Sequence, residues 1–102
     1  MERSVESRLT AIAELCRRHH VRKLELFGSA ATGSFDANSS DIDFLVEFLP
    51  EATHGFSGDY FGLKFDLEEL FGREVDLVMT GAARNPYFLR AISGTRTQVY
   101  AA

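Results

Sequence analysis

The sequence predicts one small domain that contains both helices and strands, and three observations predict it. The chain has 102 residues, a length that allows a single hydrophobic core. Its composition is typical of a globular protein, with 45% hydrophobic and 25% charged residues. Hydrophobic residues recur every three to four positions in some segments and every second position in others, in the order helix, strand, loop, strand, helix, strand, helix. We expect these elements to form one domain over residues 1–102.

The first half of the chain is expected to contain one helix and two strands. Residues 4–19 form the helix, because apolar side chains recur at spacings of three and four: Val5, Leu9, Ile12 and Cys16. Residues 23–27 form a short strand that ends at a glycine. The small, polar residues 28–40 form a loop. Residues 41–48 form the clearest strand, whose apolar face is Ile42, Phe44, Val46 and Phe48.

The second half is expected to contain a helix, a strand and a final helix. Asp59 begins a helix that reaches about Phe71 and stops at the following glycine. A third strand covers residues 74–79, with a lone acid on its polar face. Asn85 and Pro86 are the favoured first residues of a helix. This last helix is predicted to carry Phe88, Leu89, Ile92, Val99 and Tyr100.

Charge and cysteine content exclude several classes of protein. Fifteen acidic and eleven basic residues give a formal net charge of −4, which disfavours binding to a nucleic-acid backbone. The single cysteine, Cys16, permits no internal disulfide and indicates a reducing compartment. No apolar run is long enough to span a membrane, and acidic residues occur too early for a signal peptide. We therefore expect a cytoplasmic protein.

The first candidate site feature is Gly28-Ser29, directly after a predicted strand. Glycine allows close approach of a ligand to the backbone, and a serine hydroxyl with free N–H groups can hold phosphate oxygens. Taken alone, the dipeptide is more often part of an ordinary turn.

The second feature is the pair of acids at Asp41 and Asp43. Strand alternation places both carboxylates on one face, with Cα atoms about 7 Å apart. Two such anions repel each other, and a hard divalent cation would relieve the repulsion. The alternative is that both acids lie on the solvated face of a half-exposed strand.

A third acid, Asp76, favours the first of these interpretations. It is the lone acid on a strand whose other face is apolar. If this strand pairs with the strand of residues 41–48, Asp76 lies on the same sheet face as Asp41 and Asp43. Three convergent carboxylates beside a phosphate-binding turn suit two-metal phosphoryl or nucleotidyl transfer, so these three are the candidate catalytic residues.

These motifs together resemble a known family. The stretch FGSAATGSFDANSSDIDFLVEF resembles the signature of the minimal nucleotidyltransferases of the DNA polymerase β superfamily, and EVDLVM resembles the strand that carries their third acid. The segment ARNPYFLRAISGTRTQVYAA is similar to the C-terminal helix of the small MntA-type members. The resemblance implies an α+β fold, with a mixed three-stranded sheet flanked by helices.

The same resemblance implies ligands and a partner. It implies two Mg²⁺ ions held by Asp41, Asp43 and Asp76, and ATP as substrate with Gly28 and Ser29 at its phosphates. It also implies that the protein is the antitoxin of a HEPN-domain ribonuclease toxin and transfers AMP to a tyrosine of that toxin.

Two departures from the family pattern stand out. Eleven residues separate Ser29 from Asp41, where ten are commoner, and a loop absorbs one residue easily. Thr32 stands where the family often has arginine, so a cation that could contact phosphate is absent there.

Three functions are compatible with these residues. We rank a nucleotidyltransferase (a protein adenylyltransferase) first, because the Gly-Ser and all three acids are present. The second is a binding antitoxin that masks its toxin without catalysis. The third is a nucleotidyltransferase for small molecules, which the absence of a second domain disfavours.

Two further features have ordinary interpretations. Cys16 and His19 have the spacing of a partial metal pair, but a solvated helix end is the favoured interpretation because other ligands are lacking. Nine phenylalanines and three tyrosines exceed what one small core needs. We therefore hypothesise an exposed aromatic surface over residues 56–65 and 87–88 that docks a partner.

Overall fold

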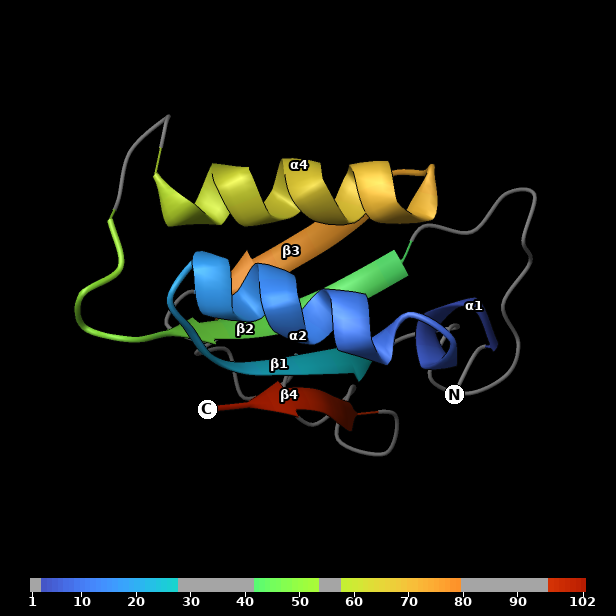
Figure 1. Cartoon of the computed structure of the whole chain (residues 1–102), viewed down its shortest axis with the longest axis horizontal. Helices are drawn as coiled ribbons and strands as arrows, with labels where there is room; N and C mark the ends of the chain where they lie inside the picture. The colour runs from blue at the N-terminus through green and yellow to red at the C-terminus, as the bar shows by residue number, and fades with distance from the viewer. Residues whose placement is uncertain (1–2, 28–41, 54–57, 80–95) are drawn as a thin grey trace, which may run out of the picture.

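The computed structural model describes residues 3–27, 42–53, 58–79 and 96–102, which form a sheet with helices against one face (Figure 1). The elements run in the order α1 (Arg3–Glu6), α2 (Leu9–Arg18), β1 (Val21–Phe27), β2 (Ile42–Phe48), α4 (Asp59–Phe71), β3 (Val75–Met79) and β4 (Thr97–Ala101). No helix among these residues is long and apolar enough to span a bilayer.

The sheet is mixed, with strand order β3-β2-β1-β4. Strand β1 is antiparallel to both β2 and β4, whereas β2 and β3 are parallel. The parallel pair is joined through α4, as a parallel connection requires a crossover. The α+β fold is therefore confirmed, but the described residues form four strands where three were expected.

The fourth strand corrects the expectation of a final helix at the end of the chain. Val99 and Tyr100 lie in β4, which is antiparallel to β1, with Tyr100 opposite Leu24. Valine and tyrosine both favour strands, and pairing with β1 supplies hydrogen bonds that the local sequence pattern does not reveal. The expected start of that helix, at Asn85 and Pro86, lies outside the described residues.

The N-terminal helix is interrupted where the sequence predicted one continuous helix. Helices α1 and α2 are separated at Ser7 and Arg8, and the Arg8 N–H donates to the carbonyl of Val5 at 3.0 Å. Val5 is fully buried and Leu9 packs against the core. The apolar spacing therefore identified the buried face correctly, although it could not locate the break.

Helix α4 begins and ends where the sequence predicted. It covers Asp59–Phe71, and Gly72 adopts the left-handed conformation (φ 67°) that ends a helix. The N–H of Gly72 donates a hydrogen bond to the carbonyl of Glu68 at 2.8 Å.

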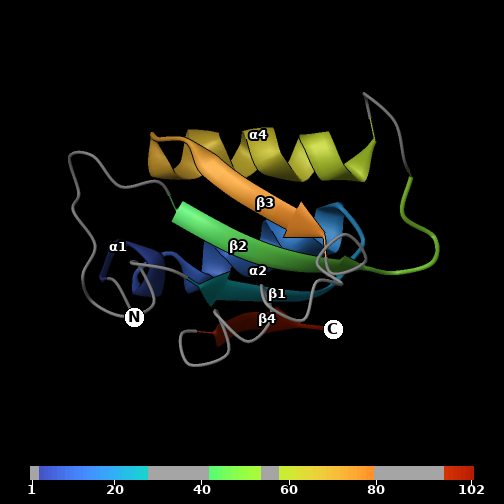
Figure 2. The same cartoon turned by 180° about the vertical axis from the view of Figure 1, so that it is seen from behind.

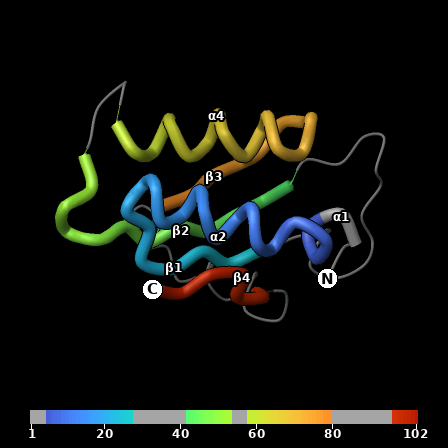
Figure 3. Tube along the Cα trace, viewed as in Figure 1, coloured from blue at the N-terminus to red at the C-terminus, as the bar shows by residue number. Residues whose placement is uncertain are grey.

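The hydrophobic core lies between the sheet and the two longer helices. Figure 3 shows α2 and α4 lying over one face of the sheet, whereas Figure 2 shows the strands from the other side. Alternate residues of each central strand face the helices. The core residues of α2, β1, β2, α4 and β3 are Ile12, Cys16, Val21, Leu24, Leu26, Ile42, Phe44, Val46, Leu63, Leu67, Val75 and Leu77. Beyond the register irregularity that follows Val21, these positions alternate along the strands, so the intervening residues lie on the opposite face.

Three polar side chains of α4 bind the backbone of β3. The Tyr60 hydroxyl donates to the carbonyl of Leu77, and Lys64 Nζ donates to the carbonyl of Val75 at 2.9 Å. Glu68 accepts a hydrogen bond from the Val75 N–H at 3.2 Å and pairs with Lys64 at 2.8 Å. The hydrogen bond between Lys64 and Glu68 raises the pKa of the lysine and lowers the pKa of the glutamate.

Candidate functional site

Asp43 and Asp76 are neighbours on the sheet face opposite the helices. They are register partners in the parallel pair of β2 and β3. Asp43 lies between the core residues Ile42 and Phe44, and Asp76 lies between Val75 and Leu77. Both side chains therefore leave the sheet on the same side, from strands about 4.8 Å apart. The predicted proximity of these two acids is confirmed.

This pair of acids has the chemistry of a cation site. Asp76 is exposed and Asp43 is half-buried. Like charges directly opposite each other on neighbouring strands repel, and a divalent cation with carboxylate ligands removes that repulsion. The two residues therefore fit a hard divalent ion.

The other predicted site residues lie outside the described residues. These are Gly28, Ser29 and Asp41. Asp41 directly precedes β2, and Gly28 directly follows Phe27, the last residue of β1. Phe27 is the register partner of Asp43. The segment with Asp41 therefore joins β2 two residues before Asp43, and the segment with Gly28 and Ser29 follows the residue of β1 that lies opposite Asp43.

Sequence reasoning missed a second charged group on the same face. Glu25 lies in the middle of β1, opposite Leu45, and is only 8% exposed. Arg96 donates two hydrogen bonds to its carboxylate, from Nε at 3.1 Å and from Nη2 at 2.6 Å. The hydrogen bonds to Glu25 raise the pKa of Arg96. A lone acid between two core leucines was the signal in the sequence that could have identified Glu25.

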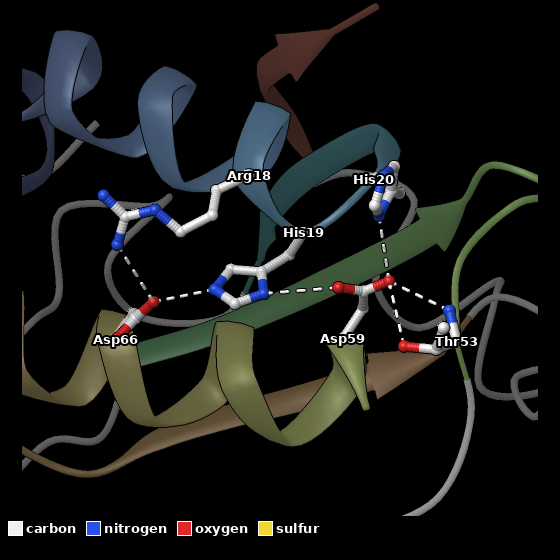
Figure 4. A network of polar contacts seen from close by, with 6 residues as sticks. All are labelled: Arg18, His19, His20, Thr53, Asp59 and Asp66. Carbon is white, nitrogen blue, oxygen red and sulfur yellow. Dashed lines mark hydrogen bonds and ion pairs between the residues drawn. The ribbon is translucent and has the colours of Figure 1, made fainter. Parts of the chain in front are cut away.

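A different cluster of acids lies on the helical side of the sheet (Figure 4). His19 follows α2 and lies between two carboxylates of α4. Its Nε2 is 2.7 Å from Asp66 and its Nδ1 is 3.4 Å from Asp59. Arg18 also approaches Asp66, at 3.6 Å. The His19 ring rests against Gly62, where a Cβ atom would come within 2.6 Å of the ring.

Asp59 is the buried centre of this cluster. Its carboxylate accepts a hydrogen bond from the Thr53 N–H at 2.9 Å, and His20 Nδ1 lies 3.1 Å away (Figure 4). Burial acts to raise the pKa of Asp59, but the hydrogen bonds from Thr53, His20 and His19 outweigh it and lower that pKa. The cluster joins the end of α2, the segment before α4 and α4 itself, and its acids are satisfied by protein donors. We interpret it as structural.

The expectation of a solvated helix end at Cys16 and His19 is wrong. Cys16 is fully buried, and burial raises the pKa of its thiol to about 12. The side chain of His19 is only 13% exposed. The two residues form no metal pair, and no group of three or more metal-ligating side chains occurs in the part of the chain that the structure describes.

One groove among the described residues lies between helices, on the other side of the sheet from the paired acids of β2 and β3. It is a shallow hollow of about 430 Å³ between α2 and α4. Its lining residues are Ala11, Glu14, Leu15, Arg18, Asp66, Glu69 and Leu70. Because it is on the helical side, it contains neither Asp43 nor Asp76.

The predicted aromatic surface is present in part on α4. Phe65 is 58% exposed, and its ring lies 6.2 Å from that of Phe61, which contacts Tyr60 edge to face. Phe56, Tyr87 and Phe88 lie outside the described residues. Docking of a partner at this surface stays a prediction.

The paired acids, the sheet order and the Gly-Ser segment agree with a match to a family model. The model named "Nucleotidyltransferase domain" matches residues 10–97 of the chain. The chain belongs to the nucleotidyltransferase family. This match spans every described strand except the last four residues of β4.

Two relatives of this nucleotidyltransferase are proteins of Methanocaldococcus jannaschii, each named as a predicted protein adenylyltransferase. One is 37% identical over 78 residues, which make up 76% of this chain and 76% of the relative. The other is 40% identical over 68 residues, which make up 66% of this chain and 68% of the relative.

Solved structures share the fold. A structure of a predicted minimal nucleotidyltransferase has a TM-score of 0.75 and 30% identity, over 95% of each chain. A toxin–antitoxin structure with AMP-PNP has a TM-score of 0.70 and 22% identity, over 92% of this chain and 73% of that one. A complex of a tri-AMPylated HEPN toxin with MNT antitoxin, from Shewanella oneidensis, has a TM-score of 0.66 and 18% identity. The match covers 96% of this chain and 73% of that one.

Proposed function

We propose that this nucleotidyltransferase is Mg²⁺-dependent, transfers AMP from ATP to a tyrosine hydroxyl of a HEPN-type toxin, and thereby acts as its antitoxin. The observation that carries the proposal is the pairing of Asp43 with Asp76 on one sheet face. Carboxylates that face each other on neighbouring strands repel, and a divalent cation bound between them relieves that repulsion.

Asp41, Asp43 and Asp76 are the proposed ligands of two Mg²⁺ ions. When bound, such ions neutralise triphosphate charge and favour ionisation of an acceptor hydroxyl. Gly28 and Ser29 are proposed to hold phosphate oxygens through backbone N–H groups and the serine hydroxyl.

These residues orient the reacting groups. In the transfer, the acceptor oxygen bonds to the α-phosphorus of ATP, its proton is released to the medium, and the bond to the β-phosphate oxygen breaks so that pyrophosphate leaves. No protein side chain forms a covalent bond in this scheme. The contribution of the chain is therefore orientation and electrostatic stabilisation.

A protein acceptor is supported by the relatives. Those of M. jannaschii are named as protein adenylyltransferases, and a structural neighbour is bound to a tri-AMPylated HEPN toxin. For this chain we propose the same class of acceptor and partner.

Masking of the toxin without catalysis is the second candidate. The exposed ring of Phe65 favours it, because an exposed aromatic side chain on a helix suits a docking surface. Docking and transfer can also operate together, so the experiment must separate them.

The test uses α-labelled ATP, Mg²⁺ and a purified HEPN toxin encoded beside the gene of this protein. We expect label on a toxin tyrosine, and loss of both labelling and neutralisation with Asp43→Asn. Glu69→Gln is the matched control, because it removes an exposed carboxylate from the helical side. Neutralisation that survives Asp43→Asn in full would favour masking.

A further inference from the structure

Glu25 and Arg96 form an ion pair on the sheet face that carries the proposed site. Glu25 lies between Leu24 and Leu26, which face the helices, so its own side chain leaves the sheet on the other side. Phe27, two residues further along β1, is the register partner of Asp43. Glu25 is therefore a diagonal neighbour of Asp43, with Cα atoms about 7 to 8 Å apart.

In this pair, the guanidinium of Arg96 compensates the negative charge of the buried Glu25 carboxylate. The side chain of Glu25 is 10% exposed, and Arg96 contacts both of its oxygens through the planar fork of the guanidinium. Lys23 Nζ lies 3.7 Å from the same carboxylate. Arg96 directly precedes β4, so the pair also fixes the start of β4 against the middle of β1.

Without its arginine, Glu25 would add a negative charge one diagonal step from the proposed metal ligands. Extra negative charge there strengthens the attraction of a divalent cation but opposes the approach of a triphosphate. A carboxylate so close to Asp43 also competes with it for the cation. A nucleotidyl-transfer site thus needs Glu25 to be neutralised.

We propose that the Glu25–Arg96 pair is a positioning pair of the transfer site, which withholds Glu25 from the cation and keeps the charge of this face suited to a nucleoside triphosphate. The inference rests on the proposed function. Arg96 acts here through Glu25 and through the placement of β4, and is not assigned a contact with substrate.

The experiment measures Mn²⁺ binding to the nucleotide-free protein by the electron paramagnetic resonance signal of free Mn²⁺. Arg96→Gln should tighten Mn²⁺ binding about three- to fivefold, and Glu25→Gln should weaken it by a similar factor, as expected for one charge about 10 Å from a divalent ion in water. The double variant Glu25→Gln/Arg96→Gln should return to within twofold of the unchanged protein. Arg96→Lys, which keeps the charge, should also stay within twofold.

Arg22→Gln is the matched control. Arg22 lies on the same strand and pairs with Glu47 at 3.2 Å, at the end of β2 away from Asp43. It should leave Mn²⁺ affinity within twofold of the unchanged protein. In transfer assays with ATP, Arg96→Gln should raise KM more than Arg22→Gln does.

The outcomes separate this inference from the function on which it rests. If Asp43→Asn does not weaken Mn²⁺ binding, the proposed function fails. If Asp43→Asn weakens binding but Arg96→Gln behaves like Arg22→Gln, the pair only stabilises the fold and this inference is overturned. If Arg96→Gln does not fold, Glu25→Gln provides the test instead. An unchanged Mn²⁺ affinity in Glu25→Gln would then overturn the inference about the Glu25–Arg96 pair.

Discussion

Two pairs of carboxylates lie on opposite sides of the sheet, and their surroundings differ. Asp59 and Asp66 lie on α4, where His19 contacts both and Asp59 also accepts the Thr53 N–H. Asp43 and Asp76 lie on the other side, as direct register partners of two parallel strands. The first pair is separated by protein donors, whereas the second pair brings two like charges together.

This difference distinguishes structural acids from candidate functional acids. A buried carboxylate that accepts several hydrogen bonds contributes to folding, and its loss leaves unsatisfied donors. Two acids placed directly opposite each other on neighbouring strands repel, and a divalent cation that binds both carboxylates relieves this repulsion. Substitutions should therefore affect stability on the helical side and activity on the other.

The largest expected effect is on transfer, at Asp76. Asp76→Asn should lower the rate of AMP transfer at least about 100-fold, because it removes a proposed ligand of the cation that offsets triphosphate charge. The same change should leave the free energy of unfolding unchanged or raise it by up to about 1 kcal/mol, since it relieves repulsion with Asp43. A labelled-ATP assay and urea denaturation measure the two quantities. A large loss of stability with proportional loss of activity would contradict the comparison.

The next largest effect is on stability, at Asp59. Asp59→Ala should lower the free energy of unfolding by about 2 to 3 kcal/mol, because it leaves the Thr53 N–H and His20 without this acceptor and removes one of the two carboxylates that contact His19. Asp66→Ala, at a more exposed carboxylate, should cost about 1 kcal/mol or less. Urea denaturation followed by circular dichroism tests both. Equal losses for Asp59→Ala and Asp76→Ala would remove the distinction between the two pairs.

A smaller effect is expected at Gly62. Alanine normally favours a helix over glycine by about 1 kcal/mol, but a Cβ atom here would meet the ring of His19 at 2.6 Å. Gly62→Ala should therefore destabilise the protein by about 1 to 2 kcal/mol. The double variant Gly62→Ala/His19→Ala, compared with His19→Ala, should show the ordinary helical gain. Thermal unfolding of the unchanged protein, the two single variants and the double variant measures the coupling between Gly62 and His19. Additive effects would show that the His19 ring does not pack against Gly62.

The smallest effect is a difference in acid stability. The pKa values of Asp59 and Glu68 are lowered from ordinary values of 3.8 and 4.5. Because the folded values are the lower ones, both acids contribute stability fully above those ordinary values, and this is lost as the pH falls through the folded values. Asp59→Ala should therefore flatten the decline of stability below about pH 4 relative to the unchanged protein. The urea midpoints of the unchanged protein and of Asp59→Ala, measured from pH 7 to pH 3, test this. Parallel curves for the two proteins would contradict the expected contribution of Asp59.

The sequence predicted the elements whose pattern is local. Strand alternation identified the core face of β2, and helical spacing with a following glycine located both ends of α4. The proximity of Asp43 and Asp76 followed from the same alternation once β2 and β3 were assumed to pair. These predictions succeeded because each depends on neighbours in the sequence or on a single pairing.

What the sequence could not predict depends on distant partners. Strand β4 pairs with a strand more than seventy positions earlier, and its residues also suit one face of a helix. Arg96 and Glu25 are 71 positions apart, and His19 and Asp66 are 47 apart. No local spacing reports such contacts, so the Glu25–Arg96 pair and the His19 cluster emerged only from the three-dimensional arrangement.

The contacts of α4 with the backbone of β3 have a consequence for solubility. Among the strands that the structure describes, β3 is the last on its side of the sheet, and an edge strand offers unpaired N–H and C=O groups to any extended chain that meets it. Here Tyr60, Lys64 and Glu68 already bind the N–H and C=O groups of Val75 and the C=O group of Leu77. An extended chain would have to displace these side chains before it could add to β3, so the helix that covers the core also shields this edge against the addition of another strand.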